Sequence, residues 1–380
     1  MLFYLFRELL QGRHYAYENP LFRGTCAALF CFLVTLLFLP RVIRRLIKWK
    51  LGDRPEFDHA SLNELTRDKS NVPTMGGVMI LGSVTLATLL LADLSCFYVR
   101  MALVCVFWLG ILGAVDDWLK LTAGRRAKSR DGLKTYEKLL FQVGLGVVLG
   151  YYVYSYGQSN YALVSTLVEP TAVPAYKVLS VPFYKTGLEL GALAFMVVTV
   201  IVMTATSNAV NLTDGMDGLA AGCVAVCALV FVVLAYIVGT EELARKLLFP
   251  HVPQSGELVV LCGAVLGACL GFLWYNCHPA RVFMGDTGSL PLGGLIGFVA
   301  VVTRQELMLL IAGGVFVIEA ISVVAQVGYF KWTRGRRLLR CAPIHHHFHL
   351  GGWSEPQTVV RFWLVAAWFA GFALATIKLR

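Results

Sequence analysis

The chain has 380 residues, of which 57% are hydrophobic and 15% are charged, with a net charge of +10. Soluble domains carry nearer a quarter charged residues, so this composition excludes an ordinary soluble protein, and the positive balance favours anionic partners. The ten cysteines are scattered without a CxxC spacing, which argues against a disulfide or metal framework. Apolar stretches near the ~20 residues that span a bilayer recur along the chain. They predict an all-α polytopic membrane protein forming a single domain over residues 1–380, and not a β-barrel, which would show short alternating segments.

The N-terminal residues 1–23 do not follow the order of a signal peptide. Within them the stretch LFYLFRELL is expected to lie on the membrane surface. Ten spanning segments are then predicted, at about 24–46, 75–93, 98–118, 138–156, 189–209, 218–238, 258–275, 288–303, 306–330 and 357–378.

The distribution of basic residues predicts the orientation. Loops that follow the odd-numbered spans hold 21 of the 33 lysines and arginines, whereas the loops after spans two, four, six and eight hold six. By the positive-inside rule the odd loops are cytoplasmic and both termini lie outside.

Five polar stretches all fall on odd loops, so one cytoplasmic site is expected. They are DKSNVPTMGG (68–77), DDWLK (116–120), NAVNLTDGMDG (208–218), NCHPARVFMGDTGS (276–289) and HHHFH (345–349).

Two adjacent carboxylates, Asp116 and Asp117, end the third span after a wholly apolar run. Consecutive helical residues point ~100° apart, so the two cannot do the same job. One can bind a metal or act as a base while the other positions a cation. Lys120, one turn on, would offset the unfavourable helix dipole. The alternative is a pair of acids solvated at the membrane interface.

The stretch NLTDGMDGL (211–219) opens the sixth span with two Asp-Gly pairs, which predict a tight turn. Helix N-termini with glycine favour phosphate, while aspartates there often only cap the helix. Capping does not readily explain four polar residues together, namely Asn208, Asn211, Asp214 and Asp217.

The stretch 276–289 likewise places an aspartate and a glycine at the start of a span, because Asp286-Thr287-Gly288-Ser289 begins the eighth span. Asp286 is a hard oxygen ligand of the kind that suits Mg²⁺. There is no Walker A pattern, which excludes a nucleotide hydrolase of that kind. Phe283 could stack on a base or could anchor the chain at the membrane interface.

The histidines His345, His346 and His347 follow a basic run. A zinc site is disfavoured, because adjacent histidines do not easily share one ion and HExxH is absent. Phosphate binding fits them better, with a solvated surface loop as the alternative. Glu319 lies in an apolar run and is a functional candidate by its position, with its role left open.

Taken together, these residues predict a Mg²⁺-dependent enzyme that moves a phosphate-linked group at the cytoplasmic membrane face. Phosphoryl transfer requires that phosphate charge is neutralised and the nucleophile aligned, and an acidic cluster, basic residues and helix N-termini can do this. A transporter would place polar groups at mid-membrane and on both faces. A structural membrane protein would not need five polar stretches on one side.

These motifs resemble the phospho-N-acetylmuramoyl-pentapeptide transferase family, within the polyprenyl-phosphate N-acetylhexosamine-1-phosphate transferase superfamily. The resemblance rests on PTMGG, DDWLK, NLTDGMDGL, NCHPARVFMGDTGS and APIHHHFH and covers all ten spans in order. It implies transfer from UDP-N-acetylmuramoyl-pentapeptide to undecaprenyl phosphate, giving lipid I and UMP with Mg²⁺, in the bacterial inner membrane. It implies no nucleic acid partner, and it leaves a homodimer open.

The resemblance also implies roles for individual residues. Asp286 would bind Mg²⁺, and Asp116 or Asp117 would engage the lipid phosphate as base or positioner. The substrate-binding residues would be Lys69, Thr74, Lys120, Lys138, Asn211, Asp214, Asp217, Asn276, Phe283, His345, His346 and His347, with Phe283 stacking on the uracil. In this family the ninth span is broken and leaves an apolar groove for the lipid, which the glycines at 313–314 fit.

The chain departs from the family pattern in two places. Where the family pattern is Lys-x-Gly-Thr-Pro-Thr, residues 69–74 of this chain read KSNVPT. The chain therefore keeps the lysine, as Lys69, but has Asn71 and Val72 in place of the glycine and the first threonine. Where the family has Lys-Gly-Leu, this chain has Asp131-Gly132-Leu133. The role of the missing lysine would therefore pass to Lys128 or Arg130. A sister transferase that uses another UDP-N-acetylhexosamine is the alternative enzyme, and APIHHHFH favours the muramoyl-pentapeptide branch.

Overall fold

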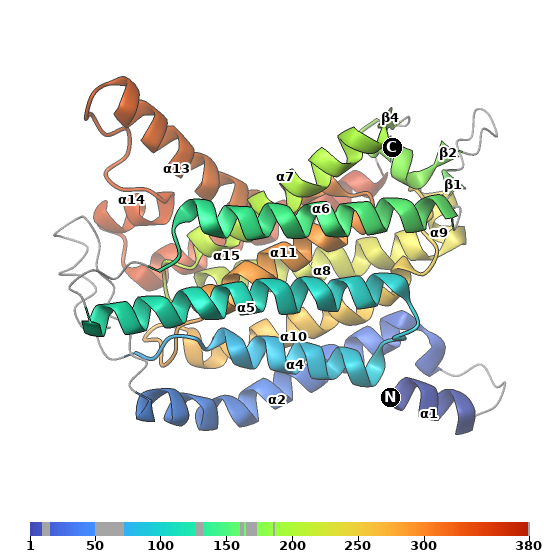
Figure 1. The fold of residues 1–380 in the computed structure, drawn as a ribbon, viewed down its shortest axis with the longest axis horizontal. Helices are drawn as coiled ribbons and strands as arrows, with labels where there is room; N and C mark the ends of the chain where they lie inside the picture. Colours follow the sequence, from blue (N-terminus) through green and yellow to red (C-terminus); the bar gives the residue numbers. More distant parts are fainter. Residues whose placement is uncertain are drawn as a thin grey trace.

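The computed structural model describes residues 1–9, 16–49, 72–126, 132–159, 163–164, 173–184 and 187–378. In these residues the long helices run side by side between the two ends of one bundle (Figure 1). Their bounds are α2 Pro20–Lys48, α4 Gly77–Leu91, α5 Phe97–Arg126, α6 Thr135–Ser159, α7 Ala192–Thr213, α8 Leu219–Gly239, α10 Leu258–Asn276, α11 Asp286–Val302, α12 Glu306–Ala312, α13 Gly314–Trp332 and α15 Glu355–Ala375.

Short elements connect these helices. They are the helices α1 Leu2–Leu9, α9 Glu241–Lys246 and α14 Ile344–Leu350, with 3-10 turns at Ala16–Glu18, Ala175–Lys177, Ser255–Glu257 and Thr376–Lys378. Two antiparallel strand pairs lie between α6 and α7, and they pair β1 Leu163–Val164 with β2 Val173–Pro174, and β3 Val178–Leu179 with β4 Leu188–Glu189.

Each of the ten predicted segments contains a helix, so the all-α polytopic class is confirmed. Eight helices in the described part of the chain are long and apolar enough to cross a membrane, while α4 and α11 are shorter, at 15 and 17 residues. Every residue of α11 is buried. This helix therefore lies inside the bundle against α5 and α7, with protein on all sides.

Most helix boundaries differ from the prediction by a few residues, and three of these differences have a visible cause. The α5 helix continues past 118 to Arg126, because WLKLTA holds good helix formers, and so the two acids lie inside it instead of at its end. The α7 helix begins at Ala192, because β4 occupies 188–189. The ninth segment is two helices that meet at Gly313, as the resemblance implies, and α13 leans away from the bundle (Figure 1).

A stripe of small residues brings α10 against α2. A Cβ added at Gly263 would lie 2.2 Å from the carbonyl oxygen of Gly24, and one at Gly267 would meet the carbonyl oxygen of Ala28. Membrane helices gain no hydrophobic driving force from one another, so close backbone packing of this kind is what holds them together.

The two ends of the bundle differ in character. Both chain termini lie at one end, beside α1 and the strands, and the C-terminal ends of α2 and α5 lie at the other with α14 (Figure 1). The described members of the five polar stretches gather at this second end, where the contacts below join them.

Candidate functional site

The site is organised around the start of α11, which Asp117 of α5 caps from another helix. Its carboxylate accepts hydrogen bonds from the backbone N–H groups of Asp286 at 3.1 Å and Thr287 at 2.9 Å, and from the Thr287 hydroxyl at 2.6 Å. The next two N–H groups, those of Gly288 and Ser289, bond to the carbonyl of Gly285. The first four N–H groups of α11 are therefore satisfied within the protein, so this helix N-terminus is not an open anion site as the sequence suggested.

Glycines make this close packing feasible. A Cβ at Gly113 of α5 would lie 2.1 Å from the carbonyl oxygen of Asp286, and one at Gly77 of α4 would lie 2.3 Å from the Cα of Gly288. Both distances are below any real Cβ contact. Only glycine at these positions lets α4 and α5 reach the backbone of α11.

The PTMGG stretch pairs with the segment before α11. The N–H of Phe283 donates to the carbonyl of Pro73 at 2.8 Å, and the N–H of Gly76 returns a bond to the carbonyl of Phe283 at 2.8 Å. Thr74 is buried between them and lies beside Gly285, and Phe283 is half-buried. Two stretches about 200 residues apart in sequence thus form one wall of the site.

Two lysines bridge two carboxylates at the centre of the site. The Lys120 Nζ lies 2.7 Å from Asp116 Oδ2 and 3.2 Å from Asp286 Oδ1. The Lys138 Nζ of α6 lies 2.7 Å from the same Asp116 oxygen and 2.6 Å from Asp286 Oδ2. Asp116 is fully buried, and its other oxygen accepts the N–H of Leu133 at 2.7 Å. Burying two negative carboxylates side by side is costly, and the positive charges of Lys120 and Lys138 offset this cost.

The turn after α7 completes this cluster. The Nδ2 of Asn211 donates to Asp286 Oδ1 and to the Ser289 hydroxyl, both at 2.9 Å. The carboxyl of Asp214 accepts the N–H of Gly285. Burial, and then the negative charge of Asp286 and Asp117, raises the pKa of Asp214 well above its ordinary value. Added positive charge in this region would favour its ionised form.

The donor set fits a hard divalent cation. Carboxylate oxygens of Asp116, Asp117 and Asp286 all lie within 4.8 Å of one another. Mg²⁺ takes oxygen ligands and is commonly held by one or two carboxylates with substrate phosphates. Because Asp117 already accepts three hydrogen bonds, Asp286 and Asp116 are the better placed ligands, in competition with the two lysines.

A second polar group lies beside this cluster. Asp217 Oδ2 accepts the N–H of Ala280 at 3.1 Å and contacts His278 Nδ1 at 3.0 Å, and the Asp217 N–H donates to Glu355 at 2.9 Å. The α8 helix begins after Gly218, whose φ is +81° and which offers no side-chain cap. Asp217 thus ties the loop 277–285 to the start of α15.

Asn276 also holds this loop. Its side-chain Nδ2 donates to the carbonyl of Val282 at 2.8 Å, and the residue is buried at the end of α10. The loop backbone that positions Phe283 and Asp286 is therefore fixed from inside.

The histidines lie in the short helix α14 and not in a solvated loop. His345 is fully buried, and its Nδ1 lies 3.0 Å from Glu319 of α13. Its Nε2 has no hydrogen-bond partner in the described residues and faces Gly215 of the 214–217 turn. His346 is buried, and His347 Nδ1 accepts the N–H of Arg340 at 3.1 Å. The surface-loop alternative is wrong for the first two histidines.

Most predicted site residues therefore meet at one end of the bundle. Lys69, Lys128 and Arg130 fall on residues whose placement or side chains the structure does not describe. Asn208 is set apart, because its amide donates to Gln142 of α6. Sequence reasoning missed Thr287 and Glu355. They resemble ordinary first-turn residues, and they bond to Asp117 and Asp217, which are distant in sequence.

The comparisons with known proteins agree with this arrangement. The family model described as Glycosyl transferase family 4 matches residues 99–304. A phospho-N-acetylmuramoyl-pentapeptide-transferase of Desulfotalea psychrophila is 44% identical over 359 residues, covering 94% of this chain and 93% of the relative. Proteins of the same name from Desulfatibacillum aliphaticivorans and Thermodesulfovibrio yellowstonii are 43% and 42% identical, each with 94% of both chains covered.

Proposed function

Because the chain belongs to glycosyl transferase family 4 and, within it, to the phospho-N-acetylmuramoyl-pentapeptide transferases, we infer that it transfers phospho-N-acetylmuramoyl-pentapeptide from its UDP-activated form to undecaprenyl phosphate. The products are lipid I and UMP, in peptidoglycan synthesis. The observation that carries this function is the pair of carboxylates, Asp116 and Asp286, bridged by Lys120 and Lys138 at one end of a membrane bundle.

The charges of this cluster suit phosphoryl transfer. Such reactions depend on positioning and on neutralising phosphate charge. Lys120 is partly exposed, with 39% of its side chain accessible, so it can turn from the carboxylates towards a phosphate. Mg²⁺ bound by Asp286 would neutralise charge on the pyrophosphate when present. Asn211 holds Asp286 in place through its amide.

The two adjacent acids of α5 are proposed to divide their work. The contacts of Asp117 hold the start of α11, and therefore the backbone of Asp286, in place. Asp116 instead meets the two lysines, which can release it when phosphate draws them away. This arrangement supports Asp116 as the group that engages the lipid phosphate and takes its proton, with Asp117 as its positioner.

The nucleotide is proposed to lie against the wall that PTMGG builds. Phe283 would stack on the uracil, with Thr74 beside it. Lys69, which lies outside the described residues, is proposed as a further nucleotide-binding residue. Asp217 and Asn276 would shape this side of the site through the loop they hold. His345 and His346 of α14 would meet the phosphate or the sugar-peptide part, with Asp214 between the two regions.

The membrane placement is proposed with the function. The lengths of the apolar runs support ten membrane-crossing segments. The distribution of basic residues supports a cytoplasmic site end and external termini. The protein would act in the bacterial inner membrane as one domain, and a homodimer is the proposed assembly.

A transfer assay tests the function. Purified protein in detergent should release UMP from UDP-N-acetylmuramoyl-pentapeptide only when undecaprenyl phosphate and Mg²⁺ are present. UDP-N-acetylglucosamine is the matched control substrate, and activity with it alone would favour the sister transferase. Absence of UMP release with either donor would contradict the proposed transfer.

A further inference from the structure

A second hydrogen-bonded layer joins α6, α7 and α11 one turn below the charged cluster. In the cluster itself, Lys138 of α6 contacts Asp286 of α11 at 2.6 Å, and Asn211 of α7 donates to the same carboxylate at 2.9 Å. The residues four positions deeper in the same three helices are Gln142, Leu290 and Ser207. Four helical residues span ~6 Å, so this second layer lies about one turn further into the bundle.

Gln142 is at the centre of this second layer. Its Nε2 donates to the Ser207 hydroxyl at 3.1 Å, and its Oε1 accepts the side-chain amide of Asn208 at 2.7 Å. The Ser207 hydroxyl in turn donates to the carbonyl of Leu290 at 2.9 Å. Gln142 and Ser207 are buried. Because both ends of the Gln142 amide have protein partners, this side chain serves to join helices and not to bind a ligand.

The hydrogen bonds of Gln142 set the position of α6 along α7. One turn further along α6, a Cβ added at Gly146 would lie 3.0 Å from the Cα of Val200, so the two helices also pack closely there. Lipid is as apolar as the helix surfaces, so buried polar pairs contribute strongly to how membrane helices associate. Lys138 lies one turn from Gln142 on the same face of α6. Fixing α6 at Gln142 therefore also fixes the backbone from which Lys138 extends.

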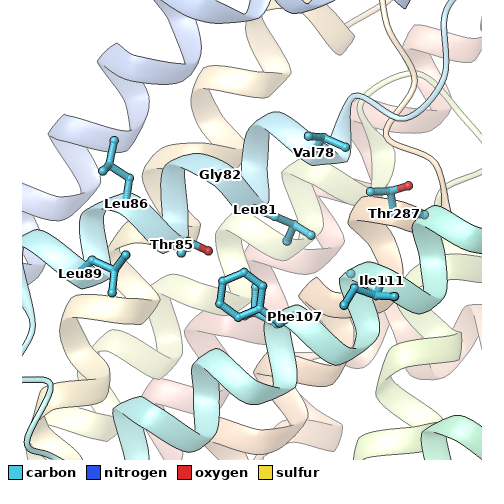
Figure 2. Close-up of a pocket in the computed structure, with 12 residues that line it drawn as sticks. Val78, Leu81, Gly82, Thr85, Leu86, Leu89, Phe107, Ile111 and Thr287 are labelled. Atoms are coloured by element: carbon cyan, nitrogen blue, oxygen red, sulfur yellow. The ribbon is translucent and has the colours of Figure 1, made fainter.

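The α4–α5 side of α11 is packed only in part. An apolar pocket of about 430 Å³ lies between α4 and α5, and Figure 2 shows Thr287 at one end of it with Val78 and Ile111. Open space beside a helix supplies no contacts to hold it. The hydrogen bond from Ser207 to the carbonyl of Leu290 instead holds α11 from the α7 side.

We propose that Gln142 is a positioning residue of the transferase, which ties α6 to α7 and α11 and so holds the Lys138 ammonium between Asp116 and Asp286. This inference rests on the proposed function and adds to it a residue that touches no substrate. The Lys138 Nζ lies 2.7 Å from Asp116 and 2.6 Å from Asp286. A lysine side chain is long and flexible, so it keeps both contacts only while α6 stays at its present distance from α5 and α11.

Gln142→Met removes the amide with little change in side-chain length, and methionine is a good helix former. Ser207 keeps its bond to Leu290, and Asn208 keeps its bond to the carbonyl of Thr204, so each partner still has a hydrogen bond. The variant should lower kcat about tenfold, or ~1.4 kcal/mol. The KM values for the UDP substrate and for undecaprenyl phosphate should stay at wild-type values, because Gln142 contacts neither.

Thr35→Val is the matched control for a loss of stability. Thr35 is fully buried in α2, and its hydroxyl donates to that of Ser83 in α4 at 3.2 Å. Ser83 keeps its bond to the carbonyl of Ile80, so this variant also removes a buried bond between helices without leaving the partner unbonded. It should lower the thermal midpoint about as much as Gln142→Met does, while kcat stays at the wild-type value.

Trace acetylation with acetic anhydride, followed by mass spectrometry, reports on Lys138 without any turnover. Only the uncharged amine reacts, and two carboxylates beside the ammonium keep it charged. In Gln142→Met the labelling of Lys138 should rise about threefold relative to that of Lys246, because its contacts with the carboxylates weaken. Lys246 is exposed in α9 at the other end of the bundle (Figure 1). Thr35→Val should leave this ratio unchanged.

The outcomes separate this inference from the proposed function. Wild-type kcat and labelling in folded Gln142→Met would overturn the inference, as would an equal loss of kcat in Thr35→Val. If Gln142→Met does not fold, Ser207→Ala breaks the same link from α7 and should give the same two changes, and their absence would overturn the inference equally. A wild type without lipid-dependent UMP release would overturn the proposed function, whereas the labelling ratio would still show whether Gln142 holds Lys138.

Discussion

Replacing Gly113 with alanine should displace the start of α11 and thereby disable the site without touching a polar residue. The added Cβ would lie 2.1 Å from the carbonyl oxygen of Asp286, 2.4 Å from its carbonyl carbon and 2.7 Å from the N–H nitrogen of Thr287. All three atoms belong to the backbone, so no side chain can rotate away. The two helices must therefore separate.

The required movement sets the magnitude. A Cβ contact needs at least 3.0 Å, so the backbones must part by about 0.9 Å. Overpacking of this kind costs about 1–3 kcal/mol, and alanine recovers up to ~1 kcal/mol in helix propensity. A net loss of about 1–2 kcal/mol leaves most proteins folded. A displacement near 1 Å in a catalytic arrangement can nevertheless lower turnover about 100-fold.

Two measurements check this prediction. UMP release gives kcat, and the thermal midpoint, followed by intrinsic tryptophan fluorescence, reports folding. Gly82→Ala is the matched control, because the same substitution on the neighbouring helix α4 meets nothing within 4 Å. It should keep wild-type turnover and a thermal midpoint at or slightly above that of the wild type. Wild-type turnover in Gly113→Ala would refute the view that close α5–α11 packing positions the site.

Further predictions concern the charged cluster and the nucleotide wall. Asp286→Asn should abolish turnover and weaken the dependence on Mg²⁺ while the protein still folds; near-normal turnover would contradict the metal assignment. Lys138→Met, which leaves Lys120 alone between Asp116 and Asp286, should lower kcat at least 100-fold, and Lys138→Arg should recover part of it. Phe283→Ala should raise the KM for the UDP substrate about tenfold, whereas Phe283→Tyr should not. Chelation with EDTA should stop UMP release, and Mg²⁺ should restore it.

The helices were predictable because membrane spans are a local property of sequence. A run of apolar residues of sufficient length becomes a helix wherever it lies, since lipid offers its backbone no other partners. All ten predicted segments contain helices for this reason. The end of α5 was misplaced, because charge marks where the apolar run stops and not where helical hydrogen bonding stops. The break at Gly313 came from the resemblance.

The gathering of the polar stretches at one end of the bundle was also predictable. Loops rich in lysine and arginine lie on the same side of a membrane, and the polar stretches lie in or next to these loops. Individual pairings were not predictable. Asp117 meets Thr287 across 170 positions, and Lys138 meets Asp286 across 148. Such pairs depend on how α5, α6 and α11 pack, and no local pattern carries that information. The contact of Glu319 with His345 is of the same kind.

The capped start of α11 explains why the chain needs two adjacent acids. An uncapped helix N-terminus could bind phosphate through its N–H groups, but here Asp117 accepts the first two of them. Under the proposed function, the charge of the phosphates would then be met by lysines and a cation, which in turn need further carboxylates to hold them. Asp116 supplies one of these on the next face of the same helix, ~100° away. Asp117 thus fixes the backbone of Asp286. Asp116 balances the charge of the lysines that contact the Asp286 side chain.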